Sequence, residues 1–172
     1  MGGRHATTRH RTPAVSLADE PGAVRQCLQA YADRGVFRGF TERPRRSDRV
    51  VFSFTWLARA PYDLIYEPAT GSFTFTNVLP NVSARTPLAR ALKTFIEARS
   101  ATRLPEHRRI NPRRASVTAF VRQGTMRLQI VAKSGHHAYG ANRVVNLVHE
   151  VYLHLQSYYP EYLWDNYDVP QD

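Results

Sequence analysis

The amino-acid sequence predicts an α+β protein in which helices pack on a five-stranded antiparallel sheet to form two layers. Apolar residues recur at helical spacing in three segments and alternate with polar residues in five shorter segments. Short turn sequences separate most of the alternating segments, and the length of 172 residues fits a single domain. The predicted element order is therefore α-β-β-β-α-β-β-α.

The first predicted helix spans residues 20–34. Its apolar stripe follows the i, i+3, i+4, i+7 pattern through Val24, Cys27, Leu28 and Tyr31. Gly35 is a natural stop after the last turn. Because Cys27 lies within the stripe, the pattern favours a small core side chain over a reactive thiol.

Three strands are expected next, joined as an antiparallel meander. Phenylalanine and tryptophan alternate with serine and threonine over residues 49–57, and a second strand is predicted over residues 62–67. A Pro-Ala-Thr-Gly turn at residues 68–71 leads to a third strand around Phe73 and Phe75. The strict alternation favours a core position for these aromatic rings over an exposed surface that stacks nucleic-acid bases.

The second predicted helix begins with Thr86 as the N-cap and Pro87 in the first turn. Two further strands are expected over residues 116–122 and 125–133, with a tight turn between them. The third helix is predicted over residues 141–158. The sheet should thus carry one apolar face under the helices and one polar face.

The two ends of the chain differ from the middle. We predict a flexible basic arm over residues 1–18, because no apolar period occurs there. Residues 19–172 then form a single α+β domain that ends in an aromatic and acidic tail. The tail should dock onto the basic body or onto a second subunit, through Tyr159, Tyr162 and Trp164.

Charge is distributed unevenly along the chain. Residues 1–143 hold all 24 lysines and arginines and nine acids, whereas residues 144–172 hold five acids and no lysine or arginine. A basic surface attracts phosphates or acidic partners, and an arginine-rich composition without a binding role is the alternative. The candidate anion or nucleic-acid contacts are Arg43, Arg45, Arg46, Arg49, Arg108, Arg109, Arg113 and Arg114.

The histidines give one candidate site and one exclusion. His136 and His137 lie in a glycine-flanked loop before the third helix, which is a candidate site. His149 and His154 resemble a zinc-peptidase motif but are spaced i, i+5, so they diverge by about 140° on a helix. The sequence contains none of the glycine-loop or nucleophile motifs that mark common enzyme classes. We therefore expect no catalytic residue, no cofactor and no metal.

Cysteine content and hydropathy predict the compartment. Cys27 is the single cysteine, which suits a reducing environment. No apolar run reaches the length of a membrane helix, roughly 18–20 residues, and the first residues lack the apolar core of a signal peptide. The expectation is a cytoplasmic protein without membrane association.

The element order over residues 20–158 resembles the type III secretion chaperone-like fold, including YbjN-type bacterial proteins. The resemblance implies a non-catalytic protein that forms homodimers and binds polypeptide segments. Our first functional hypothesis is accordingly a protein-binding or regulatory module of a chaperone-like kind. The alternative hypothesis is a nucleic-acid-binding module that uses the arginine-rich loops.

Overall fold

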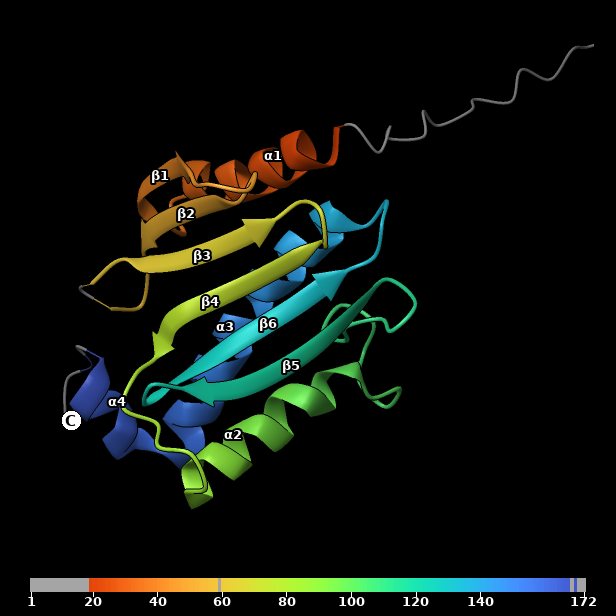
Figure 1. Ribbon diagram of the computed structural model, residues 1–172. Helices are drawn as coiled ribbons and strands as arrows, with labels where there is room; N and C mark the ends of the chain where they lie inside the picture. Colours follow the sequence, from red (N-terminus) through yellow and green to blue (C-terminus); the bar gives the residue numbers. More distant parts are fainter. Residues whose placement is uncertain (1–18, 59, 168, 170–172) are drawn as a thin grey trace, which may run out of the picture.

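The computed structural model describes residues 19–58, 60–167 and 169, and this part of the chain contains one six-stranded antiparallel sheet (Figure 1). The strands are hydrogen-bonded in the order β1-β2-β3-β4-β6-β5, so β6 joins the β5–β6 hairpin to β4. The strands are β1 (Arg38–Pro44), β2 (Val50–Thr55), β3 (Tyr62–Glu67), β4 (Ser72–Leu79), β5 (Ala115–Arg122) and β6 (Thr125–Ala132).

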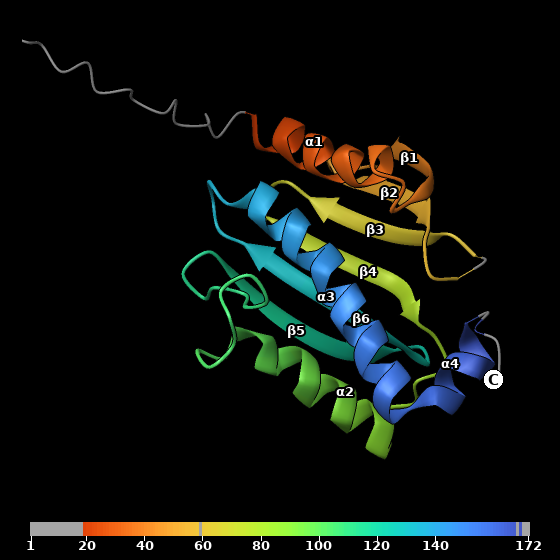
Figure 2. The same ribbon diagram turned by 180° about the vertical axis from the view of Figure 1, so that it is seen from behind.

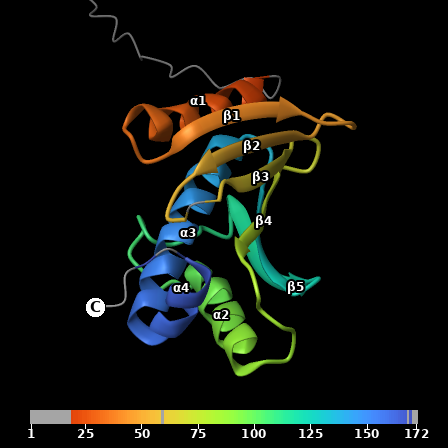
Figure 3. The ribbon, with the colours of Figure 1, turned by 90° about the vertical axis from the view of Figure 1, so that its left-hand side faces the viewer.

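Helices lie on one face of the sheet and leave the other face open (Figures 2 and 3). The helices are α1 (Glu20–Asp33), α2 (Pro87–Glu97), α3 (His137–Tyr158) and α4 (Pro160–Asn166), and the 3₁₀ turn η2 (Ala98–Ser100) extends α2. α3 crosses the middle of the covered face, α1 packs against α3, and α2 packs against β5. The α+β class predicted from the sequence is confirmed.

The core lies between the covered face and the helices. Phe52, Leu64, Phe75 and Leu128 follow one another in register across β2, β3, β4 and β6, and all four are buried. Phe54 lies on the same face of β2 and stacks on Phe37 with 3.9 Å between ring centroids. The alternating aromatic residues of the strands are thus core residues, as their period of two predicts.

The sheet has six strands rather than the predicted five, because β1 does not carry the pattern of a half-buried strand. β1 is an edge strand that pairs only with β2, and most of its residues are exposed. Such a strand does not need alternating apolar residues. Its register also shifts between Arg38 and Thr41, where Gly39 has a φ of 63°. Four strands, not three, therefore precede α2.

The C-terminal third differs from the prediction at two points. α3 begins at His137 rather than at residue 141. Gly140 lowers helix propensity, but it lets α3 approach the sheet, since a Cβ there would lie 2.8 Å from the ring of Phe73. The aromatic segment after α3, for which no secondary structure was predicted, forms the short helix α4.

Several predicted elements are confirmed. α1 begins at the predicted residue and ends at Asp33, one residue early, and β3 has the predicted bounds. Thr86 caps α2, because its Oγ1 accepts a hydrogen bond of 3.1 Å from the amide of Ala89. None of the described helices is long and apolar enough to span a membrane. The predicted arm, residues 1–18, lies outside the described residues.

Candidate functional site

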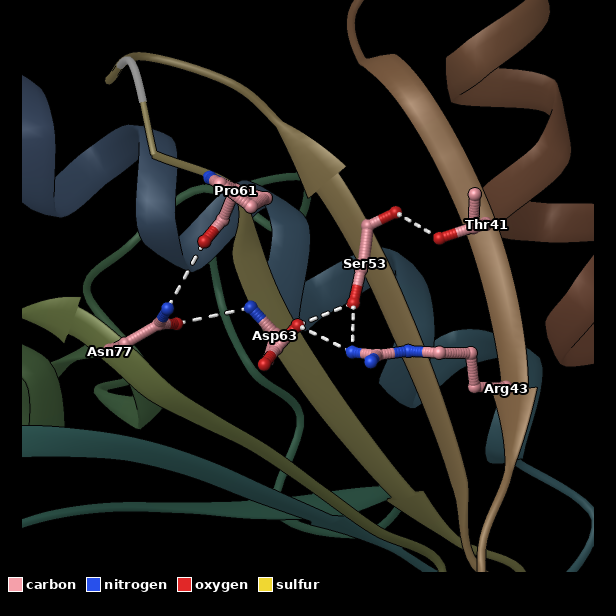
Figure 4. Close-up of polar contacts among 6 residues, drawn as sticks. All are labelled: Thr41, Arg43, Ser53, Pro61, Asp63 and Asn77. Atoms are coloured by element: carbon pink, nitrogen blue, oxygen red, sulfur yellow. Dashed lines mark hydrogen bonds and ion pairs between the residues drawn. The ribbon is translucent and has the colours of Figure 1, made fainter.

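The first arginine cluster lies on the open face of the sheet and in the β1–β2 turn. Arg43 contacts Ser53 at 2.9 Å and Asp63 at 3.4 Å, in a row of polar side chains that crosses three strands (Figure 4). Arg49 pairs with Glu67 at 3.0 Å. These contacts tie neighbouring strands together, so Arg43 and Arg49 have a clear structural role.

Figure 4 also shows how the row continues to the next strand. The backbone amide of Asp63 donates to Oδ1 of Asn77 at 3.0 Å, and Nδ2 of Asn77 donates to the carbonyl of Pro61 at 3.1 Å. All three arginines Arg43, Arg45 and Arg46 are exposed, but Arg43 contacts Asp63, whereas the ion pairs found among the described residues do not include Arg45 or Arg46. The structure therefore does not bring the four arginines of this cluster into one site.

The second arginine cluster lies elsewhere, in the loop between η2 and β5 and beside α3. Arg108 pairs with Glu150 of α3, and the guanidinium of Arg114 lies over the ring of Tyr139 at 5.3 Å. The carbonyl of Arg109 accepts a hydrogen bond from the Tyr139 hydroxyl at 3.3 Å. Arg113 is exposed. Only Arg108 of this cluster lines a cavity described below.

That cavity, which we call the arginine cavity, has a volume of about 310 Å³ and lies between α3 and the loop. Its lining residues are Arg99, His107, Arg108, Ile110, Arg143, Asn146, Leu147, His149 and Glu150. Three of these side chains are guanidiniums and one is a carboxylate, so the lining has an excess of positive charge.

Glu150 holds two of the three guanidiniums in place. Arg108 donates two hydrogen bonds of 2.7 Å to its two carboxylate oxygens, and Arg99 donates one of 2.9 Å. These guanidiniums, Arg108 first and Arg99 second, hold the pKa of Glu150 below its usual range despite its burial. The carboxylate is consequently charged at neutral pH and orients both arginines.

The third guanidinium, that of Arg143, is held by the loop rather than by a carboxylate. It donates to the carbonyl of His107 and, at 3.3 Å, to the carbonyl of Glu106. It also lies over the ring of Tyr139, 5.0 Å from the centroid. The Tyr139 hydroxyl accepts a hydrogen bond of 2.8 Å from the amide of Asn111 and so anchors the same loop to α3.

A second concavity, which we call the aromatic groove, adjoins the arginine cavity at Arg99. It has a volume of about 600 Å³ and lies between α2 and the end of α3. The lining residues are Arg90, Ala91, Thr94, Phe95, Ala98, Arg99, Arg103, His154, Tyr158 and Tyr159. The lining thus contains three guanidiniums, several aromatic rings and no carboxylate.

The rings of the aromatic groove are stacked on one another. His154 lies on Phe95 with 4.0 Å between ring centroids, and the guanidinium of Arg99 lies 4.2 Å from the Phe95 centroid. Burial, and secondly the charge of Arg99, lower the pKa of His154. Tyr158 lies 4.9 Å from His154, and yet it is 70% exposed. The groove therefore presents a large aromatic surface to solvent.

The two histidines of the predicted loop site do not form an exposed site. His137 is the first residue of α3 and is only 6% exposed, because it belongs to what we call the closed cluster, Glu20, Tyr66 and His137. Its Nδ1 lies 2.8 Å from the Tyr66 hydroxyl and its Nε2 lies 3.3 Å from a Glu20 carboxylate oxygen. His136 is the N-cap residue and makes no capping hydrogen bond with its side chain.

A neutral imidazole satisfies every polar group of the closed cluster. With the proton on Nε2, His137 donates to Glu20 and accepts from Tyr66. The backbone amide of His137 also donates to Glu20 at 3.3 Å. Burial lowers the pKa of His137, and the charge of Glu20 opposes that shift. The cluster joins α1, β3 and α3.

The C-terminal segment packs against the end of β4. The hydroxyl of Tyr162 donates to the carbonyl of Pro80 at 2.6 Å, and the buried Tyr167 donates to the carbonyl of Val78. Trp164, which we expected to dock, is 38% exposed, whereas Tyr159 lines the aromatic groove. Among the described residues of this segment, the hydroxyls of Tyr162 and Tyr167 thus tie the tail to the end of β4.

His149 and His154 lie on different sides of α3. His149 lines the arginine cavity and stacks near Trp56, with 6.5 Å between centroids. His154 lines the aromatic groove, as described above. Within the described residues, no group of three or more histidine, cysteine, aspartate and glutamate side chains is placed to hold a metal ion.

Of the four charged residues that line the arginine cavity, the sequence identified only Arg108 as a candidate, and Arg99, Arg143 and Glu150 were missed. For two of them a signal exists: Arg143, Asn146 and Glu150 are spaced i, i+3, i+7 and form a polar stripe on α3. Arg99 carries no local signal, because its partner is 51 residues away in the sequence.

Comparisons of this chain with protein-family models, with curated proteins and with solved structures found no match. The resemblance to secretion chaperones accordingly stays an expectation.

Proposed function

We propose that this chain is a non-catalytic protein-binding module that captures an acidic polypeptide segment in the aromatic groove. The segment would carry apolar or aromatic side chains for the ring surface and carboxylates for the groove arginines. The observation that carries the proposal is the composition of the lining, in which guanidiniums and stacked rings occur together without a carboxylate. Arginine, tyrosine and other aromatic residues are the types enriched at binding hot spots.

The exposure of aromatic side chains also supports the aromatic groove as the binding surface. Tyr158, which lines the aromatic groove, presents most of its ring to solvent. Exposed apolar groups beside positive charge suit a partner that supplies both apolar contact and negative charge. The net charge of +10 would speed the encounter with such a partner at low salt.

A fluorescence anisotropy titration tests the proposal. The probe is a labelled amphipathic helical peptide with leucine and tryptophan on one face and glutamate on the other, and the matched probe has lysine in place of glutamate. We expect saturable binding of the acidic peptide alone. Arg103→Glu and Tyr158→Ala should each weaken that binding by roughly tenfold, as hot-spot truncations do.

The matched control is Arg122→Glu, which makes the same change in charge at an exposed residue at the end of β5. It should bind the acidic peptide within about twofold of the original chain, allowing for the weaker long-range attraction. Equal binding of both peptides, or an equal loss in the control, would contradict the proposal.

The exposed turn arginines favour nucleic-acid binding as the second candidate function. Arg45 and Arg46 are exposed, and the ion pairs found among the described residues do not include them. Titration with a single-stranded oligonucleotide at several salt concentrations tests this role. Tight binding with a steep salt dependence, reduced in the Arg45→Gln, Arg46→Gln double variant, would favour it over peptide capture.

Self-association is the remaining expectation from the fold resemblance. Light scattering of the purified chain measures it directly. A dimer that dissociates when the acidic peptide binds would identify the groove as the shared surface. A cytoplasmic location and the absence of catalysis stay predictions.

A further inference from the structure

The arginine cavity has features that peptide capture in the neighbouring groove does not require. It lies between α3 and the loop that precedes β5, and its lining holds three guanidiniums against one carboxylate. Two positive charges are therefore left without a counter-charge in the lining when its histidines are neutral. An excess of this size within one small cavity is matched best by an anion that carries two charges.

The guanidiniums are held in place before any ligand arrives. Glu150 fixes Arg108 through two hydrogen bonds and Arg99 through one. Two backbone carbonyls and the ring of Tyr139 fix Arg143. Binding an anion here would require little ordering of long side chains, which is the main entropic cost of using arginine.

Donor groups are also available. Within the described residues, Arg99 donates a single side-chain hydrogen bond, to Glu150, although a guanidinium has five N–H groups. His107 and His149 add imidazoles to the same lining, and an imidazole nitrogen can donate to an oxyanion.

We infer that the arginine cavity binds a doubly charged oxyanion of the phosphate monoester class. Guanidiniums donate charge-assisted hydrogen bonds to phosphoryl oxygens and attract the two negative charges of the anion. The volume of about 310 Å³ accommodates a phosphoryl group with a small substituent. The ligand is either free phosphate or a phosphorylated side chain of a partner, and both present the same chemistry to the cavity.

Calorimetric titration of the full chain with inorganic phosphate tests the inference. The titration is done at low ionic strength and at a mildly alkaline pH, where the dianion of inorganic phosphate predominates. We expect saturable binding, weakened roughly tenfold or more by Arg143→Gln, because a charge-assisted hydrogen bond is lost.

A second variant is needed because Arg143→Gln also removes the hydrogen bonds that hold the loop. His107→Asp places a negative charge at the exposed side chain of the lining and keeps the backbone carbonyl that holds Arg143. It should weaken phosphate binding by a similar factor. The control Arg46→Gln removes one positive charge in the β1–β2 turn, away from the cavity lining, and should bind phosphate within about twofold of the original chain.

A short glycine peptide with one phosphoserine, compared with its unphosphorylated form, separates the two sources. Tighter binding of the phosphopeptide than of free phosphate, again lost in Arg143→Gln, supports the inference and points to a phosphorylated partner. Equal binding supports the inference and points to a small anion.

The groove variants Arg103→Glu and Tyr158→Ala should keep phosphate binding, so failure of the proposed peptide capture would leave this inference standing. No saturable binding of phosphate to the original chain would overturn the inference. It would also be overturned if His107→Asp bound like the original chain, or if Arg46→Gln lost as much affinity as the cavity variants.

Discussion

Helix α3 carries two polar clusters of opposite character. At its first residue, the imidazole of His137 lies between Tyr66 and Glu20, and each polar group finds a partner in a space closed to solvent. Further along the same helix, Glu150 and Arg143 line a cavity in which positive charge exceeds negative charge. The first cluster joins three elements of the fold, whereas the second leaves charge for a ligand.

The comparison teaches that titratable residues in a cluster do not by themselves indicate a binding site. A cluster with matched charges and satisfied hydrogen bonds stabilises the fold. A cluster with an excess of one charge, beside a cavity, is the better candidate for binding. Variants of both clusters can separate the two roles.

The largest effect is expected from the closed cluster. His137→Ala leaves the buried Tyr66 hydroxyl and Glu20 carboxylate without this partner and opens a cavity. The free energy of unfolding should fall by about 3–5 kcal/mol, measured by urea denaturation. His136→Ala is the control, because its side chain makes no capping hydrogen bond, and it should change stability by less than about 0.5 kcal/mol. Equal effects of both variants would show that the closed cluster contributes nothing to the fold.

A substitution in the arginine cavity should lower the free energy of unfolding less than His137→Ala does. Added phosphate should reverse part of that loss. Glu150→Gln removes the carboxylate that holds Arg99, whose side chain is 11% exposed. We expect a loss of about 1–3 kcal/mol of unfolding free energy. Added phosphate should restore stability to Glu150→Gln more than it stabilises the original chain, because the anion replaces the missing counter-charge. His137→Ala should show no such extra gain, and a similar gain in both variants would contradict the distinction between the clusters.

Tyr139→Phe tests whether the hydroxyl of Tyr139 holds the loop that forms one wall of the arginine cavity. The variant keeps the ring under Arg143 and Arg114 but loses the hydrogen bonds of the hydroxyl with Asn111 and Arg109. Stability should decrease by about 1 kcal/mol. Hydrogen exchange should become faster for amides of the loop, and not for those of the closed cluster. Unchanged loop exchange would show that the hydroxyl does not hold the loop.

Stability should depend on pH in two separate pH ranges, with a small loss in each. The upper range includes the titration of His137 in the closed cluster, and the lower range includes that of Glu150 in the arginine cavity. Burial lowers the pKa of His137 below its ordinary value of 6.5, so the unfolded chain binds a proton first as the pH falls. Stability should therefore decrease as the pH falls below 6.5, with a contribution of the same sign from His154, whose pKa is also lowered.

The second window lies at lower pH. The pKa of Glu150 is held below its ordinary value of 4.5, so its contribution should be lost only as the pH falls below that value. Melting temperatures of the original chain and of Glu150→Gln, recorded across both windows, test the assignment. The variant should differ in shape from the original chain only in the lower window, and a difference confined to the upper window would contradict it.

The sequence predicted most of the fold, because the buried strands and helices carry clear periods. The strand with Phe52 and Phe54 alternates at a period of two and is buried, as expected. β1 was missed, since an edge strand with one neighbour does not need that pattern. The start of α3 was missed because the helix tolerates Gly140 for the sake of close packing on the sheet.

The candidate site was far less predictable than the fold. Arginines that are neighbours in the sequence, such as Arg43 and Arg45, have different surroundings, since one is tied to Asp63 and the other is exposed in a turn. Arg99 and Glu150 form one site across a long sequence separation, which only the packing of η2 beside α3 creates. Local patterns identify the charge of a segment, and the tertiary fold decides which charges meet.

A nuclear magnetic resonance titration of the isotope-labelled chain with the acidic amphipathic peptide tests the proposed function most directly. The amide resonances that shift identify the residues that contact the bound peptide. The account predicts saturable shifts in α2, η2 and the second half of α3, the elements that line the aromatic groove. Shifts confined to the β1–β2 turn or to the open face of the sheet would contradict it, as would the absence of saturable shifts.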